Sequence, residues 1–125
     1  MNKLVFVDMD GTLSVPQYQA PDGRMVIGFA DADWLEYCRE HGAASYEFCR
    51  PVPCTARYVR AMKAAGARLF VLSSVMSDDE AEAKTVFAKR HFPDVFEAFC
   101  YVREDAQKIT EICRIAQESG VPAGD

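Results

Sequence analysis

Two aspartates near the start of the chain, Asp8 and Asp10, have the residue type and spacing that best suit metal binding or catalysis. They come directly after the apolar run Leu4–Val7 and directly before Gly11–Leu13. In an extended backbone, a spacing of two residues points both carboxylates to one side and Met9 to the other. Crowded carboxylates repel each other unless a cation or a shared proton intervenes. The pair therefore predicts a divalent metal ion beside Asp8 and Asp10.

An ordinary acidic turn is the alternative, in which Asp8 caps a loop and Asp10-Gly11 forms a bend. The functional interpretation is favoured because the pair follows a strand of the buried type. In open α/β sheets, ligands bind just beyond the carboxyl ends of the strands. Gly11 then permits a sharp turn immediately after the pair.

The elements that must position this pair alternate between strands and helices. Continuous apolar runs indicate strands that are covered on both faces, as in a parallel sheet. Such alternation gives right-handed crossovers, so the expected fold is α/β, a doubly wound parallel sheet in one domain of residues 1–125. The expected strands are 4–7, 68–72 and 99–102, and the expected helices are 31–40, 55–65, one from about Ser77 to His91 and one that ends at Gly120.

Local signals refine these elements. Ser77 and Glu80 have the pattern of a capping box, in which each side chain bonds the other residue's amide. Residues 14–30 and 43–53 contain Pro or Gly at several positions and are expected to be loop and connecting structure. The last helix is expected to share one apolar face among Ile109, Ile112, Cys113 and Ala116.

Composition and charge narrow the class of protein. With 125 residues, half of them apolar, the chain can bury a packed core. The formal net charge of −5 argues against binding to a nucleic-acid polymer or an anionic membrane, which needs a basic surface. No apolar run reaches the roughly 18–20 residues of a membrane span. Five cysteines without a C-x-x-C pair indicate free thiols, and the stretch before Asp8 is too short for a signal peptide, so a cytoplasmic location is expected.

The segment Val5–Leu13, which reads VFVDMDGTL, resembles the first signature motif of the haloacid dehalogenase (HAD)-like hydrolase superfamily in its phosphatase form. The resemblance implies that Asp8 is the nucleophile and forms an aspartyl-phosphate. It implies that Asp10 gives a proton to the leaving oxygen and later takes one from water. It also implies Mg²⁺ as the cofactor, held by the carboxylate of Asp8 and the backbone carbonyl of Asp10.

The resemblance extends to groups that would bind the phosphate. The family's second motif is a Ser or Thr that ends the second strand, which fits Ser73, with Ser74 as a near alternative. Gly11 and Thr12 of the first motif belong to the same expected phosphate-binding set.

The family's third motif is a lysine that pairs with the nucleophile, and two candidates stay open. The family spacing favours Lys108 at the start of the last helix, where the helix dipole disfavours a cation unless an anion lies nearby. Lys84 is the alternative candidate. It is otherwise explained as an exposed helical partner of Glu80, four residues earlier.

Residues 14–52 lie between the first two motifs, where the family carries a cap that covers the site and selects the substrate. Trp34, Phe29 and Tyr18 in this segment either stack on a base or sugar, as would suit a nucleotidase, or pack the cap itself. The order of the later motifs is loosely similar to the deoxyribonucleotidase branch.

The family's fourth motif, an acidic pair after a further strand, is not visible, because Gly120–Asp125 has no apolar strand before it. We therefore expect the C-terminal strands of the core to be missing, so that the chain is a fragment or another chain completes the sheet. The strand 4–7 would then have an open edge that favours self-association. With one carboxylate fewer, Mg²⁺ would bind more weakly, and turnover would be slow or absent.

Two functions follow from these expectations. The first is a Mg²⁺-dependent phosphatase for a small phosphorylated metabolite or nucleotide, which the intact Asp8 and Asp10 favour. The second is a catalytically impaired or non-catalytic HAD-like module that binds a phosphorylated ligand or a partner protein. The missing fourth motif favours this second function.

Overall fold

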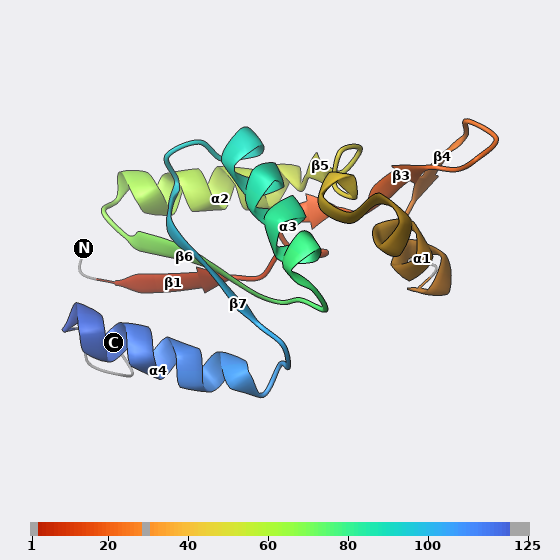
Figure 1. Cartoon of the computed structure of the whole chain (residues 1–125). Coiled ribbons are helices and arrows are strands. Elements are labelled where there is room, and N and C mark those ends of the chain that lie inside the picture. Colours follow the sequence, from red (N-terminus) through yellow and green to blue (C-terminus); the bar gives the residue numbers. More distant parts are fainter. Residues whose placement is uncertain (1–2, 29–30, 121–125) are drawn as a thin grey trace.

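Three apolar segments form the parallel sheet that leads to the two aspartates. The computed structural model describes residues 3–28 and 31–120, which form a mixed α/β fold with four α-helices and a three-stranded parallel sheet (Figure 1). In this sheet β1 (Leu4–Val7) pairs with β6 (Arg68–Ser74), and β6 pairs with β7 (Phe96–Val102). Because the strands are parallel, their carboxyl ends lie at one edge of the sheet.

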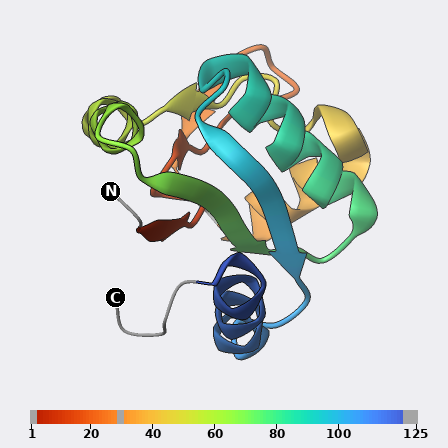
Figure 2. The same cartoon turned by 90° about the vertical axis from the view of Figure 1, so that its left-hand side faces the viewer.

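Helices cover both faces of this sheet. The helices α2 (Pro53–Ala64) and α3 (Asp78–His91) lie on one face, and α4 (Gln107–Ser119) lies on the other (Figure 2). Alternate strand residues such as Val7 and Val71 are buried in the core with Phe87 of α3. Burying an apolar side chain of this size contributes about 1.5–3 kcal/mol, so this core holds β1 firmly in place.

The segment between β1 and α2 lies beside the carboxyl ends of β1 and β6 (Figure 1). Two pairs of short antiparallel strands, residues 17–19 with 25–27 and residues 14–15 with 50–51, bracket its helix. The elements of this segment are β2 (Ser14–Val15), β3 (Gln17–Gln19), β4 (Met25–Ile27), α1 (Asp31–His41), the short 3-10 helix η1 (Gly42–Ala44) and β5 (Arg50–Pro51).

The predicted strands and helices of the core are confirmed, with differences at their ends. β6 continues to Ser74 and β7 begins at Phe96, so both are longer than predicted. α2 begins at Pro53, two residues before its predicted start, because proline is tolerated in the first turn of a helix. The predicted open edge is also present, since within residues 3–28 and 31–120 β1 pairs only with β6.

The prediction that residues 14–30 are loop is wrong for β2, β3 and β4. Pro21 and Gly23 lie in the turn of a hairpin rather than marking a structureless segment. The amide of Ala20 donates to the carbonyl of Arg24 over 2.8 Å, and Gly23 has a φ of 86°. Turn residues therefore mark only the centre of the hairpin, and the flanking residues pair. The connecting stretch 43–53 likewise contains part of η1, β5 and the start of α2.

The predicted capping box is half correct. The hydroxyl of Ser77 accepts from the amide of Glu80 over 3.1 Å, as expected. The carboxylate of Glu80 does not return to Ser77 but accepts from the amide of Met76 over 2.8 Å. In this position the carboxylate also lies 3.9 Å from the ammonium of Lys84, which attracts it.

The predicted apolar face of α4 is wrong for Ile109 and Cys113. Ile109 is 72% exposed and Cys113 is exposed, whereas Ile115 is the buried residue of this helix. The helix turns the side that carries Lys108 and Ile115 toward the sheet. This orientation brings the ammonium of Lys108 to Asp8.

Candidate active site

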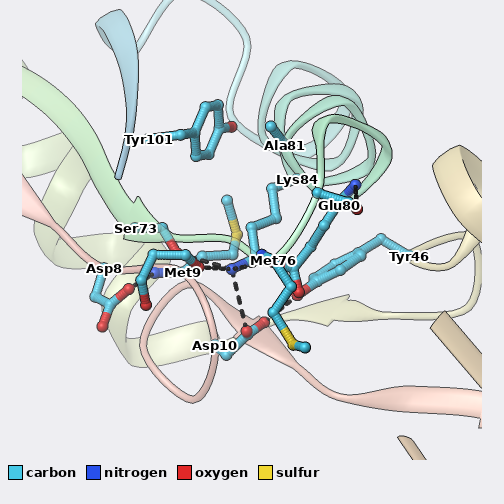
Figure 3. Close-up of polar contacts among 12 residues, drawn as sticks. Asp8, Met9, Asp10, Tyr46, Ser73, Met76, Glu80, Ala81, Lys84 and Tyr101 are labelled. Atoms are coloured by element: carbon cyan, nitrogen blue, oxygen red, sulfur yellow. Dashed lines mark hydrogen bonds and ion pairs between the residues drawn. The ribbon is translucent and has the colours of Figure 1, made fainter. Parts of the chain in front are cut away.

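Asp8 and Asp10 lie beyond the carboxyl end of β1, on either side of a buried methionine (Figure 3). Met9 has no exposed surface and belongs to the core. The side chain of Asp8 is 49% exposed and that of Asp10 is 31% exposed. The predicted alternation is therefore confirmed, with Met9 pointing inward and both carboxylates reaching the surface.

A tight turn follows the two aspartates. The carbonyl of Met9 accepts from the amides of Thr12, Leu13 and Ser14 at 2.9–3.2 Å. Gly11 has a φ of 77°, which favours glycine, and its amide donates to the carbonyl of Ser14 over 3.0 Å. Gly11 and Thr12 belong to the residues predicted to bind phosphate, and the amides of both are bonded within the turn.

Asp8 is paired with Lys108. The Oδ2 atom of Asp8 lies 3.2 Å from the Nζ of Lys108 in the first turn of α4, and its Oδ1 accepts from the amide of Met9 over 2.7 Å. The same ammonium lies 3.4 Å from Asp105. A hydrogen bond with Ser74 and the charge of Lys108 hold the pKa of Asp105 below its usual range. Asp8 therefore has a cation beside a half-exposed carboxylate, at a place where an anionic ligand can approach.

Asp10 is held by two other groups. Its Oδ2 lies 3.4 Å from the Nζ of Lys84, and its Oδ1 accepts a hydrogen bond from the hydroxyl of Tyr46 (Figure 3). Sequence reasoning missed Tyr46, which lies 36 residues from Asp10 in a stretch without a motif. The only signal available was the general one that a buried tyrosine needs a partner for its hydroxyl.

Lys84 is buried, with 2% of its side chain exposed. Its Nζ donates to the hydroxyl of Ser73 over 2.8 Å and to the carbonyl of Ser74 over 2.9 Å. The explanation of Lys84 as an exposed partner of Glu80 is therefore wrong, although the ion pair itself exists at 3.9 Å. A buried ammonium is tolerated only when it is paired and hydrogen-bonded, and Lys84 meets both conditions.

The structure thus brings together most of the residues that the sequence singled out. Asp8 and Asp10 follow β1, Ser73 and Ser74 end β6, and the two lysines reach them from opposite faces of the sheet. Lys84 and Lys108 were alternatives for one role, but each contacts a different aspartate. Ser73 is buried behind Lys84, while Ser74 is only half-buried and interacts with Asp105.

The aromatic residues of the segment 14–52 pack against one another. Tyr18 and Trp34 are both buried, with 5.9 Å between their ring centroids. Of the two explanations for these rings, the structure fits packing of the segment itself. Phe29, the third predicted aromatic residue, lies outside the described residues. Beside the site, α1 and the start of α3 enclose a cavity of about 220 Å³, which is lined by Cys38, Ser45 and Glu80 among others.

The donor set for a metal is small. In residues 3–28 and 31–120, no group of three or more His, Cys, Asp or Glu side chains is arranged to hold a metal ion. The half-exposed carboxylate of Asp8 is nevertheless suitable, because Mg²⁺ usually keeps several waters and takes one or two carboxylates plus the oxygens of a bound phosphate. The residues present therefore fit a Mg²⁺ ion that binds together with a phosphate.

None of the helices in the described part of the chain is both long and apolar enough to cross a membrane. Comparisons of this chain with protein-family models, with curated proteins and with solved structures give no match. The feature that bears on function is the site itself, in which each of two neighbouring aspartates is paired with its own lysine at the carboxyl edge of a parallel sheet.

Proposed function

We propose that this protein is a Mg²⁺-dependent phosphomonoester hydrolase of the HAD-like type, in which Asp8 captures the phosphoryl group of a small phosphorylated metabolite or nucleotide. The observation that carries the proposal is the placement of Asp8, half-exposed beyond β1, with the Nζ of Lys108 at 3.2 Å. A nucleophilic carboxylate needs access to its substrate and a nearby positive charge that offsets the incoming phosphate, and Asp8 has both.

The proposed reaction has two steps. In the first, a carboxylate oxygen of Asp8 attacks phosphorus, the bond to the ester oxygen breaks, and Asp10 gives its proton to that oxygen as the alcohol leaves. In the second, Asp10 takes a proton from water, and the hydroxide attacks the aspartyl-phosphate, which releases inorganic phosphate and restores Asp8. Lys108 lies beside the attacked group throughout and stabilises its negative charge.

Asp8 and the backbone carbonyl of Asp10 would hold the Mg²⁺ ion. When bound, the ion supplies positive charge that the phosphoryl oxygens need during transfer. The ammonium of Lys84 does not supply this positive charge to the phosphoryl oxygens. It is buried against Ser73 and Asp10, where it holds the carboxylate of Asp10 in position.

The fold supports the same proposal at a coarser level. We propose that the three-stranded parallel sheet and its helices are a Rossmann-like, doubly wound HAD core, and that residues 14–52 are its cap. The support is the position of this segment between β1 and α2, next to the carboxyl ends of the strands. The five free cysteines suit a reducing compartment, and we propose the cytoplasm.

A module that binds phosphate without turning it over is the second candidate. The observation that favours it is the small metal donor set in the described residues, where Asp8 and Asp10 lack a third acidic partner. The two candidates share the capture of phosphate at Asp8 and differ in turnover, which we expect to be slow.

Beryllofluoride, which mimics a phosphoryl group on a carboxylate, separates capture from turnover. With Mg²⁺ present, we expect ¹⁹F resonances of bound beryllofluoride for the wild-type chain and none for Asp8→Asn. The matched control is Asp105→Asn, which removes a carboxylate that contacts the same lysine and should keep the resonances.

Release of p-nitrophenol from p-nitrophenyl phosphate then reports turnover in the same samples. Capture with turnover that depends on Asp8 supports the hydrolase, and capture without turnover supports the binding module. Resonances of bound beryllofluoride in Asp8→Asn would contradict both candidates.

A further inference from the structure

We propose that Tyr46 is a positioning residue of the reaction, and that its hydroxyl fixes the carboxylate of Asp10 for proton transfer to the leaving oxygen. This inference rests on the proposed function. Tyr46 comes from the segment between β1 and α2, outside the expected motifs, and its hydroxyl donates to Oδ1 of Asp10.

The contact leaves Asp10 little freedom. A carboxylate on a short side chain rotates unless both of its oxygens are engaged. Tyr46 engages Oδ1, and Lys84 lies 3.4 Å from Oδ2. These two partners come from different elements, so a rotation that keeps one contact breaks the other. The geometry therefore selects a single orientation of Asp10, as partner groups do for catalytic side chains.

Tyr46 is itself held in place. Its ring is buried and meets Trp34 edge-on at 5.6 Å between centroids and Phe87 at 6.1 Å. Phe87 lies on α3, one turn after Lys84. One helix thus supplies the ammonium on Oδ2 and also supports the ring whose hydroxyl bonds Oδ1. The second contact of Asp10 is therefore part of the packed core and not a mobile surface contact.

The direction of the hydrogen bond determines which oxygen carries the proton. A phenol can donate its hydrogen to a carboxylate oxygen, whereas a carboxylate oxygen can only accept, so Tyr46 is the donor in this contact. Because Oδ1 accepts this hydrogen and the ammonium of Lys84 donates its hydrogen bonds to Ser73 and Ser74, Oδ2 is the oxygen of Asp10 that is left to pass a proton to the ester oxygen. Without Tyr46 the proton can occupy either oxygen, and fewer encounters have it facing the ester oxygen.

The matched experiment compares two substrates of nearly equal shape. Phenyl phosphate has a poor leaving group that depends on proton donation, whereas p-nitrophenyl phosphate has a good one that depends on it little. The readout is the single-turnover rate at which Asp8 becomes phosphorylated, measured by quenched-flow mass spectrometry, so that slow hydrolysis does not matter.

We expect Tyr46→Phe to slow the reaction with phenyl phosphate on the order of tenfold, a part of the 10²–10⁴-fold that proton transfer typically supplies. The reaction with p-nitrophenyl phosphate should change by less than about twofold, because its leaving group needs little proton donation. Adding Tyr46→Phe to Asp10→Asn should cause no further loss, because the group that Tyr46 positions is then absent.

Tyr37→Phe is the control, since it removes a hydroxyl from the same aromatic cluster, in which Tyr37 stacks on Trp34 at 6.0 Å. It should leave the ratio of the two rates unchanged. An equal loss with both substrates, or the same ratio change in Tyr37→Phe, would show that Tyr46 acts only through packing and would overturn the inference alone.

A second measurement does not need activity. The unfolding equilibrium of Tyr46→Phe, Asp10→Asn and the double variant should show coupling on the order of fivefold, as expected for one buried hydrogen bond. Strict additivity would overturn the contact. The variants can show this coupling while the wild-type chain never becomes phosphorylated at Asp8. In that case the contact exists, but the proposed function fails and the catalytic role of Tyr46 fails with it.

Discussion

Lys84 and Lys108 have different surroundings, although the sequence predicted them as alternatives for one role. Lys84 is buried among Ser73, Ser74 and Asp10, whereas Lys108 is partly exposed beside Asp8. A buried ammonium that holds several partners contributes mainly to folding, because its removal leaves those partners unsatisfied. A partly exposed ammonium contributes little to folding and is free to meet an anion.

We therefore predict opposite effects for two substitutions that remove a charge and keep a long side chain. Lys84→Met should lower the free energy of unfolding by about 2–4 kcal/mol. Lys108→Met should lower it by less than about 1 kcal/mol but weaken beryllofluoride binding on the order of tenfold, since it removes one charge-assisted contact. Urea titration and ¹⁹F spectra provide the two measurements. A Lys84→Met chain as stable as the wild type would contradict the assignment of Lys84 to the folded core.

Among single residues, local patterns found most of the side chains that cluster beyond β1 and β6 but not Tyr46, which contacts one of them. Asp8, Asp10, Ser73 and the two lysines were predictable because strand ends and their flanking residues are local features of sequence. Tyr46 was not, because its contact with Asp10 spans 36 residues and depends on how η1 packs against α3. Such a contact follows from tertiary packing, which no spacing rule encodes.

Among the elements, α4 shows where periodicity alone fails. Its sequence has apolar residues on more than one side, so the pattern permits more than one buried face. The predicted stripe through Ile109 and Cys113 turned out to be exposed, while Ile115 is buried. The pairing of Lys108 with Asp8 is consistent with the observed rotation of the helix. The sequence of α4 alone could not predict this pairing, because Asp8 lies outside the helix.

This orientation predicts unequal responses along one helix. Ile109→Lys should change the free energy of unfolding by no more than about 0.5 kcal/mol, because Ile109 is mostly exposed. Ile115→Ala should cost about 2–4 kcal/mol, because it opens a cavity between α4 and the sheet. Urea denaturation of the two variants checks the prediction. A larger loss for Ile109→Lys than for Ile115→Ala would mean that α4 presents its other side to the sheet.

For the whole molecule, the mixed α/β class and the parallel sheet were predictable because three continuous apolar runs alternate with helices. The hairpin and the short strands between β1 and α2 were not, since each pairs only two or three residues and is polar in part. Their stability comes from the buried cluster of Tyr18, Trp34, Tyr37 and Tyr46 rather than from strand propensity.

Two thiols in this packed segment make global stability depend on alkaline pH. Burial raises the pKa of Cys38 to about 11 and that of Cys49 to about 12, whereas in the unfolded chain both thiols ionise near their ordinary value of 9.0. The stability that they contribute is present below pH 9 and is lost as pH rises through the folded values, because the unfolded chain then releases protons first.

We expect thermal unfolding of the wild-type chain to occur at lower temperature as pH rises from 8 to 10.5. In Cys49→Ala this decrease should be smaller, by about 1–2 kcal/mol of unfolding free energy at the upper end. Cys113→Ala, which removes an exposed thiol, is the matched control and should follow the wild type. Parallel curves for all three proteins would contradict burial of Cys49.

The ion pair between Asp8 and Lys108 joins residues 100 positions apart. During synthesis, a nascent chain that has emerged only through α3 already contains both aspartates and Lys84, but nothing from α4. At translation rates of roughly 5–20 residues per second, some seconds separate the emergence of Asp8 from that of Lys108. The pairing of Asp8 with Lys108 therefore forms only after α4 has left the ribosome and packed against the sheet.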